Sequence, residues 1–286
     1  MQKHITDIDF SMSPYAQFYK AHTSESLFGK TPISMMNTKE YWDKMFSNYE
    51  NQGVKKEEIN IQFYRSENFK KIHDDLHVLF TGCSYTFGIG MLYDEVWSKI
   101  VYDKISKDNS VSGYYNLGIP GTSIYNQVSQ IFKYCNTYGN PDIIFYAIPD
   151  LGRFYGYDKK NNNLLNAFYK GDARNILKAL AFQYYLMLDT YCKTNSIKLY
   201  SFTWAPSEAH TYEEFDKSNI SSFDTFYKYN PKDCAQFVID YKKNNKGKKF
   251  LEMARDNDHL GIAYHEYWAK FIYEEWLKDN DNSRNK

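Results

Sequence analysis

A serine, an aspartate and a histidine stand in this chain in surroundings that suit nucleophilic chemistry. Ser84 lies in the glycine-flanked segment 82–88, and Asp256 precedes His259 by three residues near the C-terminus. A serine hydroxyl becomes a good nucleophile when an imidazole takes its proton and a carboxylate orients that imidazole. If the fold brings the three side chains together, they can carry out acyl transfer.

Acyl transfer also needs N–H donors for the negatively charged oxygen of its intermediate. The segment 116–122 contains Gly121, whose backbone N–H can approach a substrate oxygen with no Cβ in the way. A third segment, 148–153, contains Asp150 and Arg153. All three segments directly follow short apolar runs, so we expect them to be turns that open on one edge of a sheet.

Short apolar runs alternate with segments of helical periodicity between residues 77 and 204. The expected strands are 77–81, 114–117, 142–147 and 197–204, and the expected helices are 93–105, 123–134 and 175–191. This order predicts an α/β fold of three layers, α/β/α, with a central parallel sheet. Ligands of such folds bind beyond the carboxyl ends of the strands, where the three turns would lie.

Two segments fall outside this alternation. Residues 1–70 are irregular, with one helix expected over 38–51, and we assign them to an N-terminal arm or small subdomain. Residues 71–286 are expected to form the main domain, with an insertion at about 205–249. This insertion has little periodicity, and we expect it to lie as a loop or lid on the carboxyl edge of the sheet.

The charges of the chain balance. Lys and Arg together number 35, as do Asp and Glu, so the formal net charge is zero and no bulk field attracts nucleic acid. A local basic patch such as 242–249 is the exception. Aromatic residues make up 19% of the chain, with 28 Tyr, and because they are spread throughout they favour a Tyr-rich core over a sugar-binding platform.

No sequence signal for export or membrane insertion is present. No apolar run approaches the roughly 18 to 20 residues of a spanning helix, and the first residues lack the apolar region of a signal peptide. We therefore expect a soluble chain, cytoplasmic by default. The four Cys form no C-x-x-C pair, so neither a disulfide framework nor a zinc ribbon is indicated.

The ordered set of segments resembles the SGNH (GDSL-like) hydrolases, a family of lipolytic and carbohydrate esterases with a flavodoxin-like sheet. The segment 82–88 (GCSYTFG) is similar to the family's first block, and 116–122 (NLGIPGT) is similar to its second. Asp256 and His259 are similar to its closing D-x-x-H. The resemblance extends from about residue 72 to the C-terminus, and the blocks occur in the family's order.

The resemblance implies a serine esterase that needs no cofactor and no metal. Ser84 would be the nucleophile, His259 the general base and then acid, and Asp256 the group that orients His259. The N–H groups of Ser84 and Gly121 would bind the oxyanion. The implied substrate is a small-acyl ester such as an O-acetylated sugar, or a lipid ester; a Tyr-rich insertion favours the sugar. A protein partner could dock on the N-terminal arm.

Two positions depart from the family's pattern. Cys83 stands where the family has an aspartate before the nucleophile. Asp150 stands where an asparagine normally donates to the oxyanion, and an ionised carboxylate would repel that oxygen. Losing one such donor costs about 2.7 to 4 kcal/mol of transition-state stabilisation. Arg153 and Asn126 are the candidate replacements.

Several alternatives stay open at this point. The substitution at Asp150 also fits a binding or structural protein that retains the fold with little catalysis. Transfer of the acyl group to a sugar cannot be separated from hydrolysis, because water and sugar hydroxyls are chemically alike. A metal cluster is a further alternative, although no second set of ligands with comparable spacing appears elsewhere; its ligands would be Asp256, Asp258, His259, His265 and Glu266.

Overall fold

The centre of the fold is a four-stranded parallel sheet with the strand order β2-β1-β3-β6. The computed structural model describes residues 50, 53–60, 64–71, 74–120, 122–149, 153–158, 163–168, 172–203 and 231–284. The strands are β1 (Val78–Thr81), β2 (Tyr115–Asn116), β3 (Ile143–Ile148) and β6 (Lys198–Thr203). Each bound lies within one residue of the expected one, so the strand prediction is confirmed. Numbered along the chain, the order is 2-1-3-4, as in flavodoxin-like sheets.

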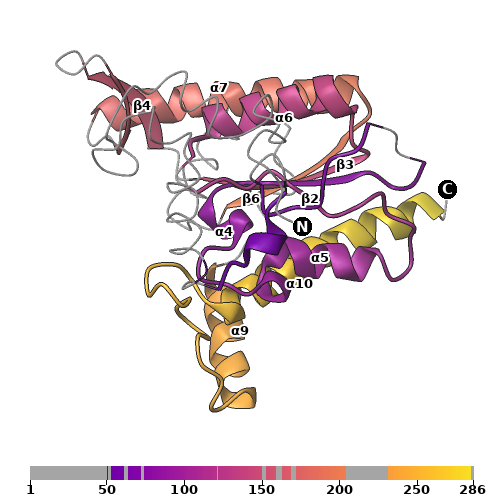
Figure 1. The fold of residues 1–286 in the computed structure, drawn as a ribbon, viewed down its shortest axis with the longest axis vertical. Coiled ribbons are helices and arrows are strands. Elements are labelled where there is room, and N and C mark those ends of the chain that lie inside the picture. Colours follow the sequence, from indigo (N-terminus) through magenta and orange to yellow (C-terminus); the bar gives the residue numbers. More distant parts are fainter. Residues whose placement is uncertain are drawn as a thin grey trace.

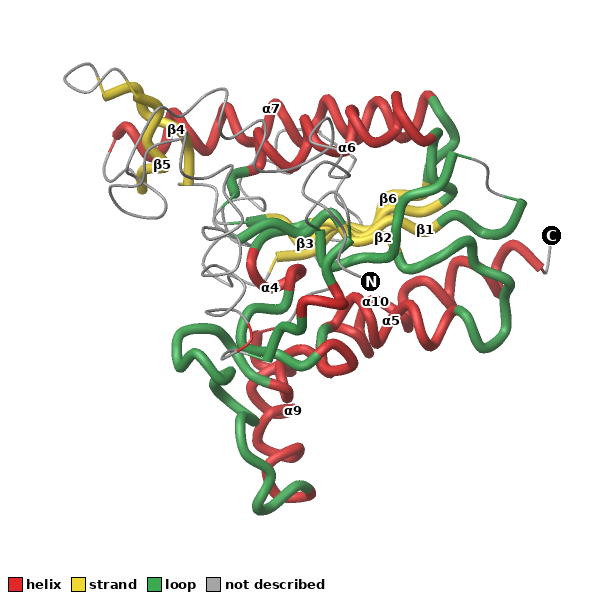
Figure 2. The backbone as a smooth tube through the Cα atoms, viewed as in Figure 1, coloured by secondary structure: helices red, strands yellow, loops and turns green. Residues whose placement is uncertain are grey.

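Helices cover both faces of this sheet, as Figures 1 and 2 show. One face is covered by α5 (Trp97–Ile105) and α10 (Ile262–Arg284), and the other by α6 (Ile124–Tyr138) and α7 (Asp172–Thr194). Neighbouring residues of β1 alternate between the two layers, because successive strand side chains point to opposite faces. The expected three-layer α/β/α fold is therefore confirmed.

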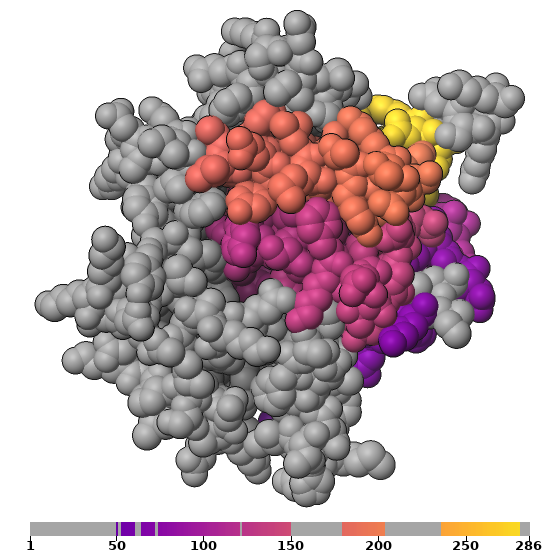
Figure 3. Space-filling model, turned by 90° about the horizontal axis from the view of Figure 1, so that it is seen from above, coloured from indigo at the N-terminus to yellow at the C-terminus, as the bar shows by residue number. Residues whose placement is uncertain are grey.

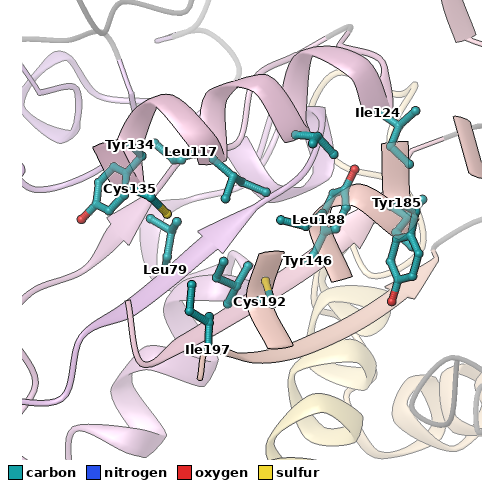
Figure 4. Close-up of a cluster of buried hydrophobic side chains, with 14 of the residues drawn as sticks. Leu79, Leu117, Ile124, Tyr134, Cys135, Tyr146, Tyr185, Leu188, Cys192 and Ile197 are labelled. Carbon is teal, nitrogen blue, oxygen red and sulfur yellow. The ribbon is translucent and has the colours of Figure 1, made fainter. Parts of the chain in front are cut away.

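The core between the sheet and α6 and α7 is rich in tyrosine. Figure 4 shows Tyr134, Tyr146 and Tyr185 among the aliphatic side chains of this cluster. The Tyr134 hydroxyl lies 2.8 Å from the His77 imidazole, and the Tyr185 hydroxyl lies 2.5 Å from Ser201 Oγ. Two of these buried tyrosines thus find hydrogen-bond partners inside the core, whereas the buried Tyr146 hydroxyl has none among the described residues.

The outer surface of this layer, formed by α7 and α6 lying side by side, is seen in Figure 3. A shallow apolar hollow of about 460 Å³ lies on it, and none of the candidate catalytic residues lines this hollow; it is lined by Phe132, Leu186, Met187, Thr190 and Tyr191. Among the described helices, none is both long enough and apolar enough to cross a bilayer.

Two elements were not expected from the sequence. An antiparallel hairpin, β4 (Arg153–Asp158) with β5 (Asn163–Phe168), follows β3. The expectation of an irregular insertion at about 205–249 is wrong over Pro231–Asn244, which form helix α9. Residues 204–230 lie outside the described part of the chain. The helix expected over 38–51 also lies outside it, apart from Glu50.

Helix α9 packs on α10 through an aromatic contact, although most of its residues are polar. Phe237 packs against Tyr267 of α10 with ring centroids 5.4 Å apart. One turn later the Tyr241 hydroxyl donates to Glu266 Oε1 at 2.9 Å. Residues four apart face the same side of a helix, so one narrow stripe suffices to dock α9 on α10.

Part of the N-terminal segment is integrated into the core. Tyr64 and Phe69 belong to the cluster under α6. The Arg65 guanidinium, 1% exposed, donates to the carbonyl oxygens of Gly88 at 2.7 Å and Met91 at 3.1 Å, and it pairs with Glu58 at 2.6 Å. Arg65 therefore supports the loop that follows Ser84, and the boundary at residue 70 stays a prediction.

Removing the Arg65 guanidinium should destabilise the fold strongly. Arg65→Ala removes the guanidinium that pairs with the mostly buried Glu58 and leaves the Met91 carbonyl without its donor, and breaking such a buried pair costs about 3 to 5 kcal/mol. Urea unfolding of the variant measures this loss. The matched control is Lys270→Ala, which removes an exposed pair with Glu274 and should change the unfolding free energy by at most about 0.5 kcal/mol. Equal effects of the two variants would contradict the role given to Arg65.

Candidate active site

Ser84 lies at the carboxyl end of β1, at the centre of the sheet. β1 lies between β2 and β3, where the chain reverses its direction of travel across the sheet. Such switch points are where open α/β sheets bind ligands. The short helix α4 (Ser84–Phe87) begins at the serine itself, two residues after Gly82, and Ser84 is 7% exposed.

Gly88 ends α4 after a single turn. Its φ of +82° is in the left-handed region, and its N–H donates to Ser84 O at 2.8 Å. A Cβ at this position would lie 2.3 Å from Val96 Cγ2, so a larger residue would disturb the turn. The chain is thereby turned away directly after the serine helix.

The second turn is hydrogen-bonded to the serine turn. Asn116 Nδ2 donates to Thr86 O at 2.8 Å, while Asn116 Oδ1 accepts from the Gly118 N–H at 2.7 Å. The Ile119 N–H donates to Gly82 O at 3.1 Å. Residues 116–119 are therefore fixed against α4. Gly121 itself lies outside the described residues.

Asp256 and His259 form a short hydrogen-bonded pair. Asp256 Oδ2 lies 2.5 Å from His259 Nδ1, and Asp256 Oδ1 accepts from the backbone N–H groups of His259 at 3.1 Å and Asp258 at 3.2 Å. Partial burial alone would raise the pKa of Asp256, but the hydrogen bonds from His259 and Asp258 outweigh it and the pKa lies below its ordinary value. The carboxylate is therefore ionised at neutral pH.

This pair is docked on the loop that follows Ser84. The Arg255 N–H donates to Gly90 O at 3.0 Å, and the Arg255 guanidinium donates to both carboxylate oxygens of Glu95, at 2.6 and 3.0 Å. The approach is close, since a Cβ on Gly90 (φ +74°) would lie 2.7 Å from Ala254 Cβ. Figure 1 shows the chain between α9 and α10 passing beside α4.

The imidazole of His259 lies beside the residue that follows the serine. The ring centroids of Tyr85 and His259 are 5.1 Å apart, with an interplanar angle of 72°. Among the described residues, the hydrogen-bond partner of the Ser84 hydroxyl is Cys83 Sγ at 4.0 Å, and no hydrogen bond joins the hydroxyl to His259. Hydrogen bonds between nucleophile and base often tighten only when substrate binds.

The expected oxyanion residues are only partly described. Asp150 lies outside the described residues, and Arg153 is the first residue of β4, with its side chain outside the described part. Arg153 is thus a strand residue opposite Phe168 rather than part of a turn. Asn126 Oδ1 accepts from the Ser123 hydroxyl at 2.8 Å at the start of α6. The oxyanion donors stay predictions.

His265 has a structural contact that sequence reasoning missed. Its Nδ1 accepts the Trp97 N–H at 3.0 Å, which joins α10 to the start of α5. Burial, with a smaller contribution from the charges of His259 and Arg65, lowers the pKa of His265 to about 3. Within the described part of the chain, no three His, Cys, Asp or Glu side chains gather in a metal-binding group.

Sequence reasoning also missed the residues that hold the site together. Tyr85, Glu95 and Arg255 lie next to or between the motifs and follow no periodic pattern. Tyr85 and Arg255 are the immediate neighbours of Ser84 and Asp256, and this adjacency was the available signal.

Comparison with known proteins assigns no family. No protein-family model matches the chain, and no curated protein does. Among solved structures the chain is similar to one described as "Crystal Structure of TesA", with 12% identity, coverage of 69% of this chain and 96% of that chain, and a TM-score of 0.43. A likeness of this extent carries no inference about activity.

The buried His265 should make the fold sensitive to acid. Unfolded histidine takes up a proton near a pKa of about 6.5, whereas the native imidazole does not until the pH approaches its lowered pKa of about 3. The stability contributed by neutral His265 is therefore present above pH 6.5 and is lost as the pH falls, by about 1.4 kcal/mol per pH unit.

Urea unfolding at pH 7, 6, 5 and 4 measures this dependence. His265→Asn should unfold with a shallower pH dependence than the wild type, even if it is less stable at pH 7. Identical slopes for the two proteins would contradict a neutral, buried His265.

Proposed function

We propose that the chain is a serine hydrolase of the SGNH type that cleaves a carboxylic ester. Ser84 is its nucleophile, His259 its general base and then acid, and Asp256 the carboxylate that orients the imidazole. The observation that carries the proposal is the 2.5 Å pair of Asp256 and His259, docked with its imidazole against the residue that follows Ser84. Tyr85 and His259, about 170 positions apart in the chain, thereby lie in contact close to the carboxyl end of β1.

The proposed reaction has two halves. Ser84 Oγ attacks the ester carbonyl carbon while its proton passes to His259 Nε2, and the resulting tetrahedral intermediate breaks its C–O bond as His259 returns the proton to the leaving alcohol. Water then attacks the acyl-serine in the same way and releases the acid. Asp256, ionised because of its lowered pKa, holds the Nδ1 proton and stabilises the imidazolium.

The oxyanion of the tetrahedral intermediate needs hydrogen-bond donors at the same carboxyl edge of the sheet. The N–H of Ser84 is the first of α4 and has no acceptor within the helix, so it is available to a ligand. The N–H of Gly121 is the proposed second donor, because the hydrogen bonds of Asn116 and Ile119 hold the start of that turn against α4. Arg153 is proposed as the replacement for the third donor, offsetting Asp150.

The proposed substrate is a small-acyl ester, such as an O-acetyl group on a carbohydrate. Transfer of the acyl group to a sugar hydroxyl follows the same two halves, with the sugar in place of water. A screen of acetylated glycans and short acyl esters, with and without acceptor sugars, separates these outcomes by product.

Replacing the nucleophile should abolish the reaction. Ser84→Ala is expected to lower kcat for p-nitrophenyl acetate by about 10⁶-fold, to the level of the uncatalysed background, and to abolish labelling by a fluorophosphonate. Ser106→Ala is the matched control, because Ser106 is exposed on the far end of α5 and should leave both readouts unchanged. Undiminished turnover in Ser84→Ala would refute the assignment.

Replacing the Asp256 carboxylate should lower kcat, because this carboxylate orients the His259 imidazole. Asp256→Asn cannot hold the same tautomer of His259, and kcat should fall by about 10⁴-fold with little change in KM. Asp258→Asn is the matched control, since the side chain of Asp258 is exposed and only its N–H contacts Asp256. A similar loss in both variants would argue against a specific role for Asp256.

A second candidate is a protein that binds an ester-bearing ligand with little catalysis. The observation in its favour is that the Ser84 hydroxyl contacts Cys83 Sγ and not His259. Under this candidate the wild-type protein resists labelling by a fluorophosphonate. The Ser84→Ala variant then binds acetylated glycans as tightly as the wild type does, a comparison that calorimetry can make.

A further inference from the structure

Tyr85 connects the serine turn with the histidine segment at two points and with α10 at a third. Its ring packs edge-on against the His259 imidazole, with centroids 5.1 Å apart, and against Trp268 at 5.7 Å with an interplanar angle of 80°. Its hydroxyl accepts a hydrogen bond from the backbone N–H of Leu260. One side chain therefore contacts both the imidazole and the peptide group that follows it.

These contacts restrict the motion of the His259 ring that its hydrogen bond to Asp256 still permits. The hydrogen bond to Asp256 fixes Nδ1 of the imidazole, but a single hydrogen bond still permits the ring to tilt about it. The Tyr85 ring restricts that tilt, and the N–H of Leu260 restricts the backbone of the same loop. Trp268, 1% exposed, supports Tyr85 from α10 and keeps its ring from rotating away.

Tyr85 is also covalently tied to the nucleophile. Ser84 and Tyr85 are the first two residues of α4, a helix of one turn whose end is fixed by Gly88 and Arg65. Any shift of the serine turn therefore moves Tyr85 with it, and through Tyr85 it moves the imidazole. Tyr85 therefore adds a second connection between the serine turn and the histidine loop, beside the contacts of Arg255 with Gly90 and Glu95.

The geometry points to Tyr85 as a positioning residue that holds the His259 imidazole toward Ser84 during acyl transfer. The inference rests on the proposed serine hydrolase function and deepens it. Tyr85 itself touches no reacting atom. Burial raises the pKa of its hydroxyl above the ordinary value, so the side chain stays neutral and acts through packing and its hydrogen bond.

The kinetic test compares three variants with the wild type. Tyr85→Leu removes the ring contact, and Tyr85→Phe keeps the ring and removes the acceptor for the Leu260 N–H. Tyr273→Leu is the matched control, since Tyr273 also stacks on a tryptophan of α10, Trp276 at 5.5 Å. Each variant is assayed with p-nitrophenyl acetate, well below its own unfolding temperature.

Tyr85→Leu should lower kcat about 100-fold with KM nearly unchanged, because misplacing a catalytic group by about 1 Å costs this much. Tyr85→Phe should recover most of the rate and remain about 5-fold below the wild type, as the loss of one neutral hydrogen bond implies. Tyr273→Leu should keep the wild-type kcat. Equal rates in Tyr85→Leu and Tyr273→Leu would overturn the inference while leaving the hydrolase function intact.

A spectroscopic readout separates the inference from the function. In ¹⁵N-histidine-labelled protein, the Nδ1 proton of His259, assigned with His259→Gln, should give one deshielded signal because of its short bond to Asp256. The signal should broaden in Tyr85→Leu, and less so in Tyr85→Phe, and stay sharp in Tyr273→Leu. An unchanged signal in both Tyr85 variants overturns the positioning role, whether or not the protein hydrolyses esters.

If Tyr85→Leu does not fold, Tyr85→Phe decides the matter through the same two readouts. If the wild type is inactive but its His259 signal depends on Tyr85, the proposed function fails and the structural connection between Tyr85 and His259 stands.

Discussion

The arrangement of the site depends on the docking of one loop, residues 254–261, against the turn that follows β1. The backbone bond from Arg255 to Gly90 and the paired hydrogen bonds from Arg255 to Glu95 carry this docking. Paired bonds between a guanidinium and a carboxylate fix orientation as well as distance. Together with the packing of α10 beside α5 on the sheet, this contact determines where Asp256 and His259 lie.

The parallel sheet determines the position of Ser84, as the loop contacts determine the position of Asp256 and His259. β1 is an inner strand whose four residues are all buried, and it delivers Ser84 to the carboxyl edge where the chain reverses across the sheet. Support below Ser84 comes from Arg65, which lies outside the strand and helix alternation. A buried guanidinium that donates to the carbonyls of Gly88 and Met91 ties the N-terminal segment to the candidate site. Fold stability and site geometry therefore share the same residues.

The two inner strands, β1 and β3, were predictable because they are nearly continuous apolar runs, as strands buried on both faces require. Ser84, Asp256 and His259 were predictable as candidates because short motifs carry them. The hairpin of β4 and β5 was missed, although aromatic and aliphatic residues flank the polar segment 159–162, because no element was assigned between the turn expected at 148–153 and the helix expected at 175–191. Helix α9 was missed because Phe237 and Tyr241 form too narrow a stripe in a lysine-rich segment.

Long-range side-chain contacts could not be predicted from spacing. The pairing of Arg255 with Glu95 spans 160 residues, and no local pattern reveals it. The same holds for Tyr85 and His259, which meet only because two loops converge.

The central claim is that Ser84, His259 and Asp256 act as one chain of proton contacts, and the structure of a covalent adduct tests it most directly. The measurement is a crystal structure of the wild-type protein after reaction with a fluorophosphonate. The proposed triad predicts phosphorus bonded to Ser84 Oγ and His259 Nε2 within about 3 Å of that oxygen. An adduct on another residue, or an imidazole turned away from Ser84, would contradict it.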